Sequence, residues 1–198
     1  MFAAALRLAL ILGITLSWTM SAPPAMAQDT IQLPAVEKTG GMPLLEALAA
    51  RHSERGIKED ALSEKQLSEI LWSAFGVNRD DGKRVIPTAR GKNELAVYAV
   101  LTTGVYLYDP AKNVLTLELA GDHTADYEKS PLTLLFAAPD NVVGGLHAGS
   151  AYQGAGLYCA SAGLANVVKG TGADNLKGQL KLPDGFEVLV VQLIGLPG

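Results

Sequence analysis

The segment Arg51-His52-Ser53-Glu54-Arg55 brings two guanidinium groups, a hydroxyl and an imidazole together within five residues. Planar, permanently charged arginines beside a hydroxyl suit the oxygens of a phosphate group. The same residues also suit the solvated end of a helix, where basic side chains interact favourably with the helix dipole. These five residues alone leave both interpretations open, so the elements that position them have to be considered.

Two helices are expected around this segment. The first runs from Pro43, which suits an opening helical turn, to about Arg55, with Gly56 as its stop. The second begins with the capping-box pattern Ser63-Glu64-Lys65-Gln66 and carries apolar residues at the helical period up to Gly76. A polar, basic loop is expected to follow this second helix, over residues 78–91.

After residue 91 the chain has mainly the pattern of strands, with one further helix. The first three predicted strands should form an antiparallel meander, and the continuous apolar run at 132–138 indicates a buried central strand. A helix rich in Gly and Ala is expected over 148–162, and Gly144-Gly145 before it is expected to be a turn. Helices mixed with antiparallel strands, without a βαβ repeat, indicate the α+β class. The predicted strands cover 95–101, 105–108, 114–119, 132–138, 164–168 and 188–194.

The first 27 residues have the pattern of a secretory signal peptide, with Arg7 before a short apolar core and an Ala25-Met26-Ala27 cleavage site. We therefore expect an exported protein, periplasmic or secreted, that starts at Gln28. The apolar core is short of the ~20 residues of a membrane span, so no membrane association is expected after cleavage. Residues 28–41 are expected to form an extended arm, and residues 42–198 a single domain.

Composition excludes several kinds of function. The formal net charge of −4 argues against a nucleic-acid binder, which would carry a strongly basic surface. The three histidines lie far apart without ligand spacing, so no metal site is expected. Cys159 is the only cysteine and sits in an apolar run, which favours a buried, inert thiol. No nucleophile elbow, metal-ligand cluster or phosphate-binding loop motif is present, so hydrolase chemistry lacks a candidate constellation. A cofactor that brings its own reactivity would need little more than the basic and polar groups that remain.

The chain resembles the nitroreductase family of flavoproteins, and within it the compact branch related to the azoline dehydrogenases of peptide-modification clusters. Several short segments occur in the family's order and together cover roughly the whole mature chain. They include Arg51-His52-Ser53-Glu54-Arg55, Pro87-Thr88-Ala89-Arg90 and Gly195-Leu196-Pro197. The remaining segments are residues 40–48, 62–79, 81–84, 104–109, 157–165 and 167–170.

The resemblance implies a homodimer with a central antiparallel sheet wrapped by helices and with FMN between the two subunits. It implies hydride transfer through the flavin to or from a small organic substrate, with NAD(P)H as an electron donor. Because the flavin would supply the reactivity, the resemblance implies no catalytic side chain. The direction of this reaction stays open. The residues implied to bind the cofactor fall into three groups. Arg51, His52, Ser53 and Arg55 hold the phosphate and ribityl chain, Thr88, Ala89 and Arg90 approach the flavin, and Lys169 and Gly170 lie near its reactive edge.

Three positions depart from the family pattern. Gly91 and Gly154 stand where the family usually has asparagine, and no basic residue follows Pro197. Two glycines close together in a helix, Gly154 and Gly156, make sense if another segment packs very near or if the helix starts later than residue 148. These departures motivate an alternative hypothesis, in which the chain is a degenerate, non-catalytic exported binding module that keeps the fold and has lost tight flavin binding.

Overall fold

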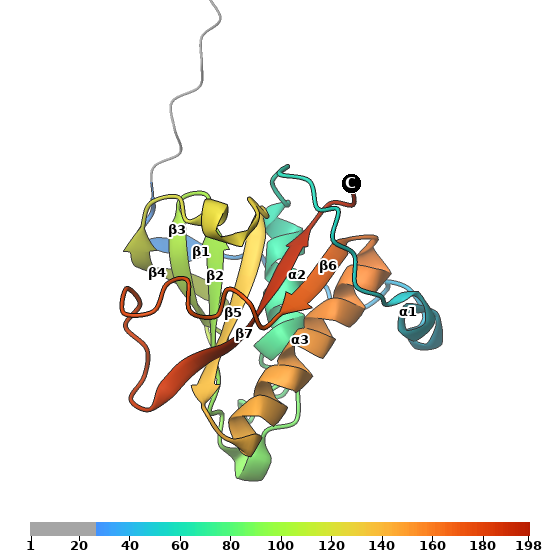
Figure 1. The fold of residues 1–198 in the computed structure, drawn as a ribbon. Helices are drawn as coiled ribbons and strands as arrows, with labels where there is room; N and C mark the ends of the chain where they lie inside the picture. The colour runs from blue at the N-terminus through green and yellow to red at the C-terminus, as the bar shows by residue number, and fades with distance from the viewer. Residues whose placement is uncertain (1–26) are drawn as a thin grey trace, which may run out of the picture.

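A computed structural model describes residues 27–198. The expected signal peptide therefore lies outside the described residues, apart from its last residue. A seven-stranded antiparallel sheet with strand order β1-β4-β3-β2-β5-β7-β6 forms the centre of the domain (Figure 1). Its strands are β1 Thr30–Gln32, β2 Ala96–Leu101, β3 Gly104–Asp109, β4 Val114–Ala120, β5 Leu132–Pro139, β6 Ala165–Lys169 and β7 Phe186–Gly195. The helices are α1 Leu44–Ala50, α2 Glu64–Phe75 and α3 Val142–Ala162, with short 3-10 turns η1 Ala89–Gly91 and η2 Thr124–Tyr127.

The sheet is covered differently on its two faces. Helices α2 and α3 pack on one face, and α1 lies outside them against α3 (Figure 1). The other face has its own apolar cluster, covered by η2 and by the chain between β6 and β7. The α+β architecture with an antiparallel sheet and packed helices is as expected. Among residues 27–198, no helix combines the length and hydropathy needed to cross a bilayer.

The strand predictions are confirmed. The meander is β2, β3 and β4, paired antiparallel in sequence order. Residues 132–138 form the central strand β5, which is buried along almost its whole length. The N-terminal arm adds β1 at the far edge, where Ile31 pairs with Leu115 of β4. Strand β6 is the opposite edge of the sheet, so one side of its backbone has no neighbouring strand.

Helix α2 begins as predicted, since Ser63 and Gln66 form both hydrogen bonds of a capping box. The expected end of the first helix at Arg55 is wrong, because α1 stops at Ala50 and the backbone of Arg51 is already non-helical. The reason is tertiary. The main-chain N–H of Glu54 donates to the carbonyl oxygen of Asn166 in β6, at 2.8 Å, instead of continuing the helix.

Helix α3 begins earlier than predicted, at Val142 instead of Ala148, and the expected turn at Gly144-Gly145 is inside it. The Asn141 side chain accepts hydrogen bonds from the main-chain N–H groups of Val143 and Gly144, which is a strong N-terminal cap. Gly144 fits because a Cβ there would lie 2.0 Å from the carbonyl oxygen of Pro139. The start of α3 is therefore packed directly against the end of β5.

Gly154 has a comparable reason to be glycine. A Cβ at this position would lie 2.3 Å from the carbonyl oxygen of Ser73, near the end of α2. The close approach of another segment, expected from the glycines in this helix, is thus provided by α2.

Candidate functional site

The segment 51–55, called the donor segment below, lies along the outer edge of the sheet. The hydrogen bond from Glu54 to Asn166 attaches it to the start of β6. Beyond it, Ile57 forms an antiparallel bridge with Pro197, and the Lys58 N–H donates to the Leu196 carbonyl oxygen at 3.0 Å. The donor segment is therefore fixed on both β6 and the end of the chain.

The donor segment presents hydrogen-bond donors that other side chains do not occupy. Among residues 27–198, the guanidinium groups of Arg51 and Arg55 and the hydroxyl of Ser53 have no hydrogen-bond or ion-pair partner. His52 differs, since its Nδ1 lies 2.7 Å from the Ala50 carbonyl oxygen at the end of α1. Its Nε2 lies 3.6 Å from the Glu54 carboxylate. Arg51, Ser53 and Arg55 thus provide two cations and a hydroxyl for a phosphate-like anion.

The helix-end interpretation of these residues applies only in part. The last turn of α1 contains no basic residue, and Arg51 is its C-terminal cap. Ser53 and Arg55 lie beyond the helix, so the helix dipole does not account for them.

Strand β6 connects the donor segment to Lys169. Asn166 is bonded to Glu54, and Lys169 ends the strand three residues later, roughly 10 Å away at the usual rise per residue. Because orientation alternates along a strand, Val168 directs its backbone polar groups to the same open side as Asn166. The donor segment and Lys169-Gly170 therefore lie at the two ends of one open strand edge.

The side chain of Lys169 points to the sheet face opposite the helices, together with its cross-strand partner Val191. Its side chain is 21% exposed, and its ammonium forms an ion pair with Glu128. Glu128 and Lys129 both have left-handed backbone conformations, with φ of 58° and 55°. Such conformations in residues other than glycine cost free energy and persist only where the surroundings hold them. The ammonium of Lys169 is thus paired with a carboxylate from a strained turn. Gly170, which follows it, is exposed.

Thr88, Ala89 and Arg90 lie elsewhere. They belong to η1, whose Ala89 N–H donates to Nε2 of His147 at 2.8 Å. His147 is near the start of α3, whereas the donor segment meets the chain just after the end of α3. The 16 residues from His147 to Gly163 correspond to roughly 24 Å of helix. Within one chain, the structure brings the donor segment close to the β6 edge and leaves Thr88–Arg90 apart.

His147 is a residue of this region that the sequence did not reveal. It is buried, 2% exposed, and its Nδ1 lies 3.3 Å from the Glu94 carbonyl oxygen. Its partners Ala89 and Glu94 are 58 and 53 positions away in the chain. A local pattern could not have indicated it, since only the fold brings these residues together.

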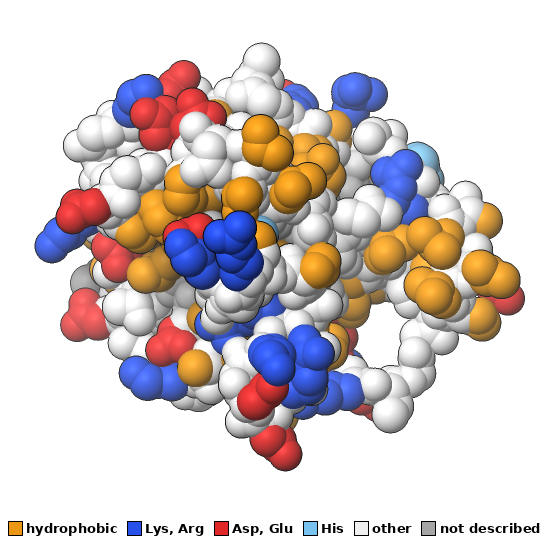
Figure 2. All heavy atoms as spheres, turned by 90° about the horizontal axis from the view of Figure 1, so that it is seen from below, with side chains coloured by type: hydrophobic (Ala, Val, Ile, Leu, Met, Phe, Trp, Pro, Cys, Tyr) orange, Lys and Arg blue, Asp and Glu red, His pale blue; other side chains and the backbone are white. Residues whose placement is uncertain are grey.

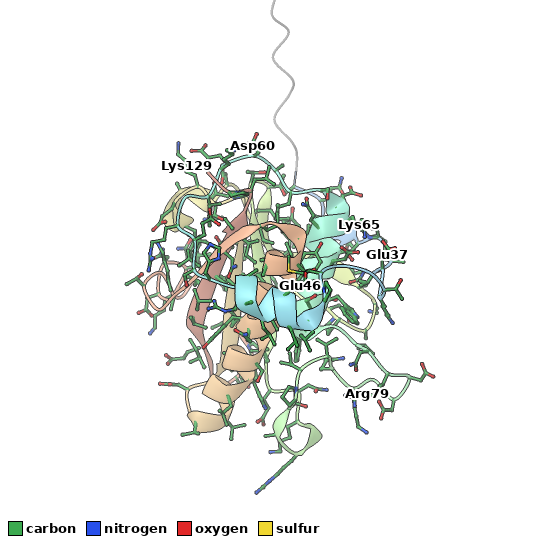
Figure 3. The ribbon with its side chains drawn as sticks, turned by 90° about the vertical axis from the view of Figure 1, so that its right-hand side faces the viewer. Glu37, Glu46, Asp60, Lys65, Arg79 and Lys129 are labelled. Atoms are coloured by element: carbon green, nitrogen blue, oxygen red, sulfur yellow. The ribbon has the colours of Figure 1, made fainter. Side chains whose placement is uncertain are left out.

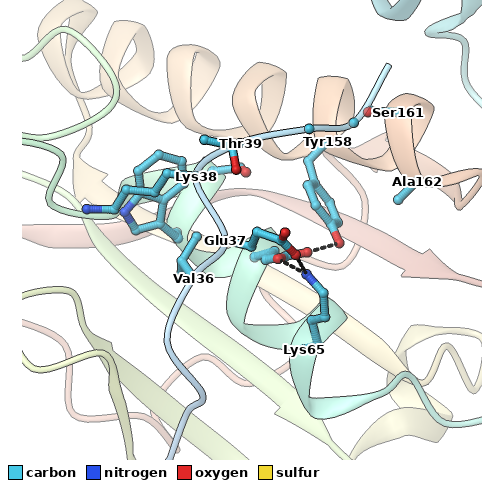
Figure 4. A pocket seen from close by; sticks show the side chains of 13 residues that line it. Val36, Glu37, Lys38, Thr39, Lys65, Tyr158, Ser161 and Ala162 are labelled. Carbon is cyan, nitrogen blue, oxygen red and sulfur yellow. Dashed lines mark hydrogen bonds and ion pairs between the residues drawn. The ribbon is translucent and has the colours of Figure 1, made fainter. Parts of the chain in front are cut away.

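A cleft of about 410 Å³ lies under the N-terminal arm, between α2 and α3 (Figure 4). Lys65 lies 3.0 Å from the Glu37 carboxylate and also pairs with Glu69, which accepts a hydrogen bond from the Tyr158 hydroxyl at 2.7 Å. Figure 3 shows Lys65 and Glu37 side by side at the edge of the molecule. These polar groups bind one another, so we interpret the cluster as a clasp that holds the arm.

The clasp has a defined protonation state. Burial raises the pKa of Glu69, but the hydrogen bonds from Lys65 and Tyr158 outweigh burial and leave this pKa below its ordinary value. Burial and the bond to Glu69 raise the pKa of the Tyr158 phenol. At neutral pH the clasp therefore contains an ionised carboxylate and a neutral phenol, which is its fully bonded state.

Cys159 is fully buried, and burial raises the pKa of its thiol to about 12. The thiol is therefore protonated and unreactive, as expected from the sequence. Within residues 27–198, no three side chains of His, Cys, Asp or Glu gather in a way that could hold a metal ion.

Comparison with solved structures finds one similar sequence and further proteins of the same fold. A protein from Ralstonia eutropha JMP134 described as a nitroreductase is 33% identical, with a TM-score of 0.78 over 90% of this chain and 96% of that one. A Bacteroides fragilis nitroreductase with bound FMN is 15% identical, with a TM-score of 0.57 over 78% of this chain and 88% of that one. The Escherichia coli microcin synthetase complex McbBCD is 19% identical, with a TM-score of 0.63 over 85% of this chain and 77% of that one. No protein-family model and no curated protein matches the sequence.

Proposed function

The chain belongs to the nitroreductase family, and we propose on that basis that it is an FMN-dependent oxidoreductase acting on a small organic molecule. The FMN-bound member of this fold supports flavin as the cofactor. When bound, the flavin supplies the hydride chemistry, and the protein binds it, orients it and shapes access to it. NAD(P)H is the proposed electron donor. We propose no side chain as a general acid or base in the reaction.

The main structural support for FMN binding is that three side chains of the donor segment can donate hydrogen bonds and have no partner among residues 27–198. They are Arg51, Ser53 and Arg55. Arg51 and Arg55 are always charged, and arginine binds phosphate oxygens in a planar, bidentate manner. Ser53 adds a hydroxyl donor between them. Because Glu54 is bonded to Asn166, this segment is already ordered on the sheet. Little conformational entropy would be lost on binding a phosphate, which favours affinity.

The β6 edge suits the remainder of the cofactor. With the phosphate on the donor segment, the ribityl chain and ring would extend along the open edge towards Lys169 and Gly170. Val168 and Gly170 offer main-chain polar groups there, and backbone N–H groups are donors that no side-chain substitution removes. His52, whose ring is held at the end of α1, flanks the phosphate end.

We propose a homodimer in which each flavin uses two subunits. Thr88–Arg90 lies roughly 24 Å along α3 from the donor segment, and one FMN is too short to contact both. A partner subunit would supply the second loop. Exposed apolar side chains support such an interface, with Leu45 of α1 79% exposed and Val142 of α3 80% exposed. Figure 2 shows hydrophobic side chains gathered on the right, where α1 lies, and near the basic groups in the centre.

The departures from the family pattern do not favour the alternative of a non-binding relative. Gly91 has a φ of 68°, a left-handed conformation that glycine adopts readily and that asparagine also tolerates. Gly154 is required by the contact with Ser73. Gly154 therefore has a local packing reason that is independent of flavin, and the conformation at Gly91 suits glycine and asparagine alike.

We also propose that the protein is exported after cleavage behind Ala27. A mature chain beginning at Gln28 would keep every described element, since β1 starts at Thr30. N-terminal sequencing of protein recovered from the periplasm or medium tests this directly. A first residue of Gln28 is expected, and recovery of the full-length chain from the cytoplasm alone would contradict export.

The experiment for the main proposal is an absorbance spectrum of the mature protein after incubation with FMN and removal of free ligand. We expect the spectrum of bound flavin, with one FMN per chain. Protein that retains no flavin from saturating FMN would contradict the proposed function and would favour the non-catalytic binding module.

A further inference from the structure

We propose that His147 is a positioning residue for the flavin-contacting loop, and that it acts by holding residues 88–94 in one conformation. This inference rests on the proposed function, since it concerns how Thr88–Arg90 is presented to the flavin. His147 itself is buried, so its role is exerted through the loop.

The two hydrogen bonds of His147 define one form of its ring. The Ala89 N–H can only donate, so Nε2 must accept and carries no proton. The proton of the neutral ring is then on Nδ1, which faces the Glu94 carbonyl oxygen at 3.3 Å. Each ring nitrogen is thereby matched to one end of the loop. A doubly protonated ring would place an N–H against the Ala89 N–H and would break the first bond.

These two bonds are the loop's connection to the body of the protein. Among residues 27–198, no other hydrogen bond joins residues 88–94 to another element. The remaining bonds are internal, such as Gly91 N–H to the Thr88 carbonyl oxygen at 3.3 Å and the Thr88 hydroxyl to Asn93 at 3.3 Å. Among the described residues, the hydrogen bonding between the loop and α3 is therefore provided by His147.

The conformation of the loop also requires stabilising contacts from outside the loop. Arg90 has a φ of 55°, a left-handed conformation that costs free energy in a residue other than glycine. Gly91 after it is left-handed as well. Without the bond at Ala89, the chain could relax Arg90 to an ordinary conformation, which would move the three residues proposed to approach the flavin.

His147 is itself held in place. It lies in the second turn of α3, whose start is capped by Asn141 and packed on Pro139 through Gly144. The ring is thus a fixed support between the end of β5 and the loop. A residue that carries such a loop without touching the flavin is expected to affect flavin affinity more than overall stability.

Two isosteric substitutions separate the two bonds. The amide of glutamine reaches about as far as Nε2 and can accept from the Ala89 N–H, whereas the amide of asparagine reaches only as far as Nδ1. His147→Gln should therefore keep the Ala89 bond, and His147→Asn should keep only the bond to Glu94. Both variants leave a polar group at the buried position.

The test combines amide hydrogen exchange of the flavin-free protein with FMN titration by fluorescence. Slow exchange at Ala89 is expected in wild type and in His147→Gln, and fast exchange in His147→Asn. FMN affinity should fall roughly tenfold in His147→Asn, the size expected for one lost hydrogen bond, and should be largely restored in His147→Gln. The variant Arg51→Ala/Arg55→Ala should leave exchange at Ala89 unchanged.

The outcomes are distinguishable. If wild type binds FMN and His147→Asn binds it equally well, the positioning role is wrong and the proposed function stands. If both variants lose affinity and melting temperature to the same extent, His147 is only a structural core residue and the inference also fails. If wild type takes up no FMN, the proposed function fails and the role of the loop towards flavin fails with it, whatever the exchange at Ala89.

Discussion

The main-chain N–H of Glu54 lies 2.8 Å from the carbonyl oxygen of Asn166, and this bond places the donor segment at the head of the edge strand β6. The two residues are far apart in the chain, so the contact is a product of the fold. Helix α1 ends at Ala50, and the side chains of Arg51, Ser53 and Arg55 have no hydrogen-bond or ion-pair partner among residues 27–198. Of the two interpretations of residues 51–55, the structure therefore favours an anion site over a helix end.

Arg51→Ala combined with Arg55→Ala should lower FMN affinity by at least about 100-fold, since hydrogen bonds to charged groups contribute about 1.5–3 kcal/mol each. The melting temperature of the flavin-free protein should hardly change, because neither guanidinium has a partner among residues 27–198. Isothermal titration gives the affinity. The control is Arg79→Ala, which removes an exposed arginine on another loop (Figure 3) and should bind FMN like wild type.

Gly154→Ala should destabilise the protein by about 1–3 kcal/mol, because the added methyl group would overlap the Ser73 carbonyl oxygen. The matched control is Gly145→Ala in the same helix, where the new Cβ would meet no atom within 4 Å apart from the adjacent backbone of α3 itself. Alanine there should stabilise by up to about 1 kcal/mol through helix propensity. Urea unfolding of both variants provides the comparison, and equal effects would show that the α2–α3 contact is looser than described.

The elements that follow local rules could be predicted from sequence. Helix α2 is specified by its capping box, and strands β2 to β5 by apolar alternation or continuous apolar runs. The two helix boundaries that differ depend on other parts of the fold. Helix α1 ends where Glu54 bonds Asn166, and α3 begins where Gly144 can approach Pro139, which no local pattern reports.

The role of the candidate site residues in binding a cofactor stays a prediction, but their placement in the fold can be compared with the sequence. Arg51, Ser53 and Arg55 stood out by type and spacing, and their positions on one ordered segment agree with a shared role. The link between Ala89 and His147 was not predictable, because an isolated histidine has no spacing that marks its partners. The clasp of Glu69 with Tyr158 was missed for the same reason, since these residues lie 89 positions apart.

The clasp should make stability depend on pH in the acidic range. The pKa of Glu69 is lower in the folded protein than its ordinary value of 4.5, so its contribution is complete above about 4.5 and is lost as the pH falls towards the folded pKa. Chemical unfolding at neutral and acidic pH should show a smaller loss of stability on acidification in Glu69→Gln than in wild type. An identical loss in both proteins would show that Glu69 does not cause the pH dependence of stability.

The proposed sharing of each flavin site between two subunits predicts that variants damaged in different halves of the site complement each other. Arg51→Ala/Arg55→Ala and Arg90→Glu should each bind FMN poorly when made alone, because each spoils one half of every site. Co-refolding the two should restore about a quarter of the wild-type flavin content, since random pairing makes about half of the dimers mixed and each mixed dimer has one intact site. No restoration would argue that one subunit supplies the whole site.

The central claim is that the donor segment binds the phosphate of FMN, and the most direct test compares FMN with riboflavin. A ligand that binds the native state raises the melting temperature by mass action. We expect FMN to raise the melting temperature of wild type well above the effect of equal riboflavin, and this difference to vanish in Arg51→Ala/Arg55→Ala. Equal shifts by FMN and riboflavin in wild type, or no shift by either, would contradict the claim.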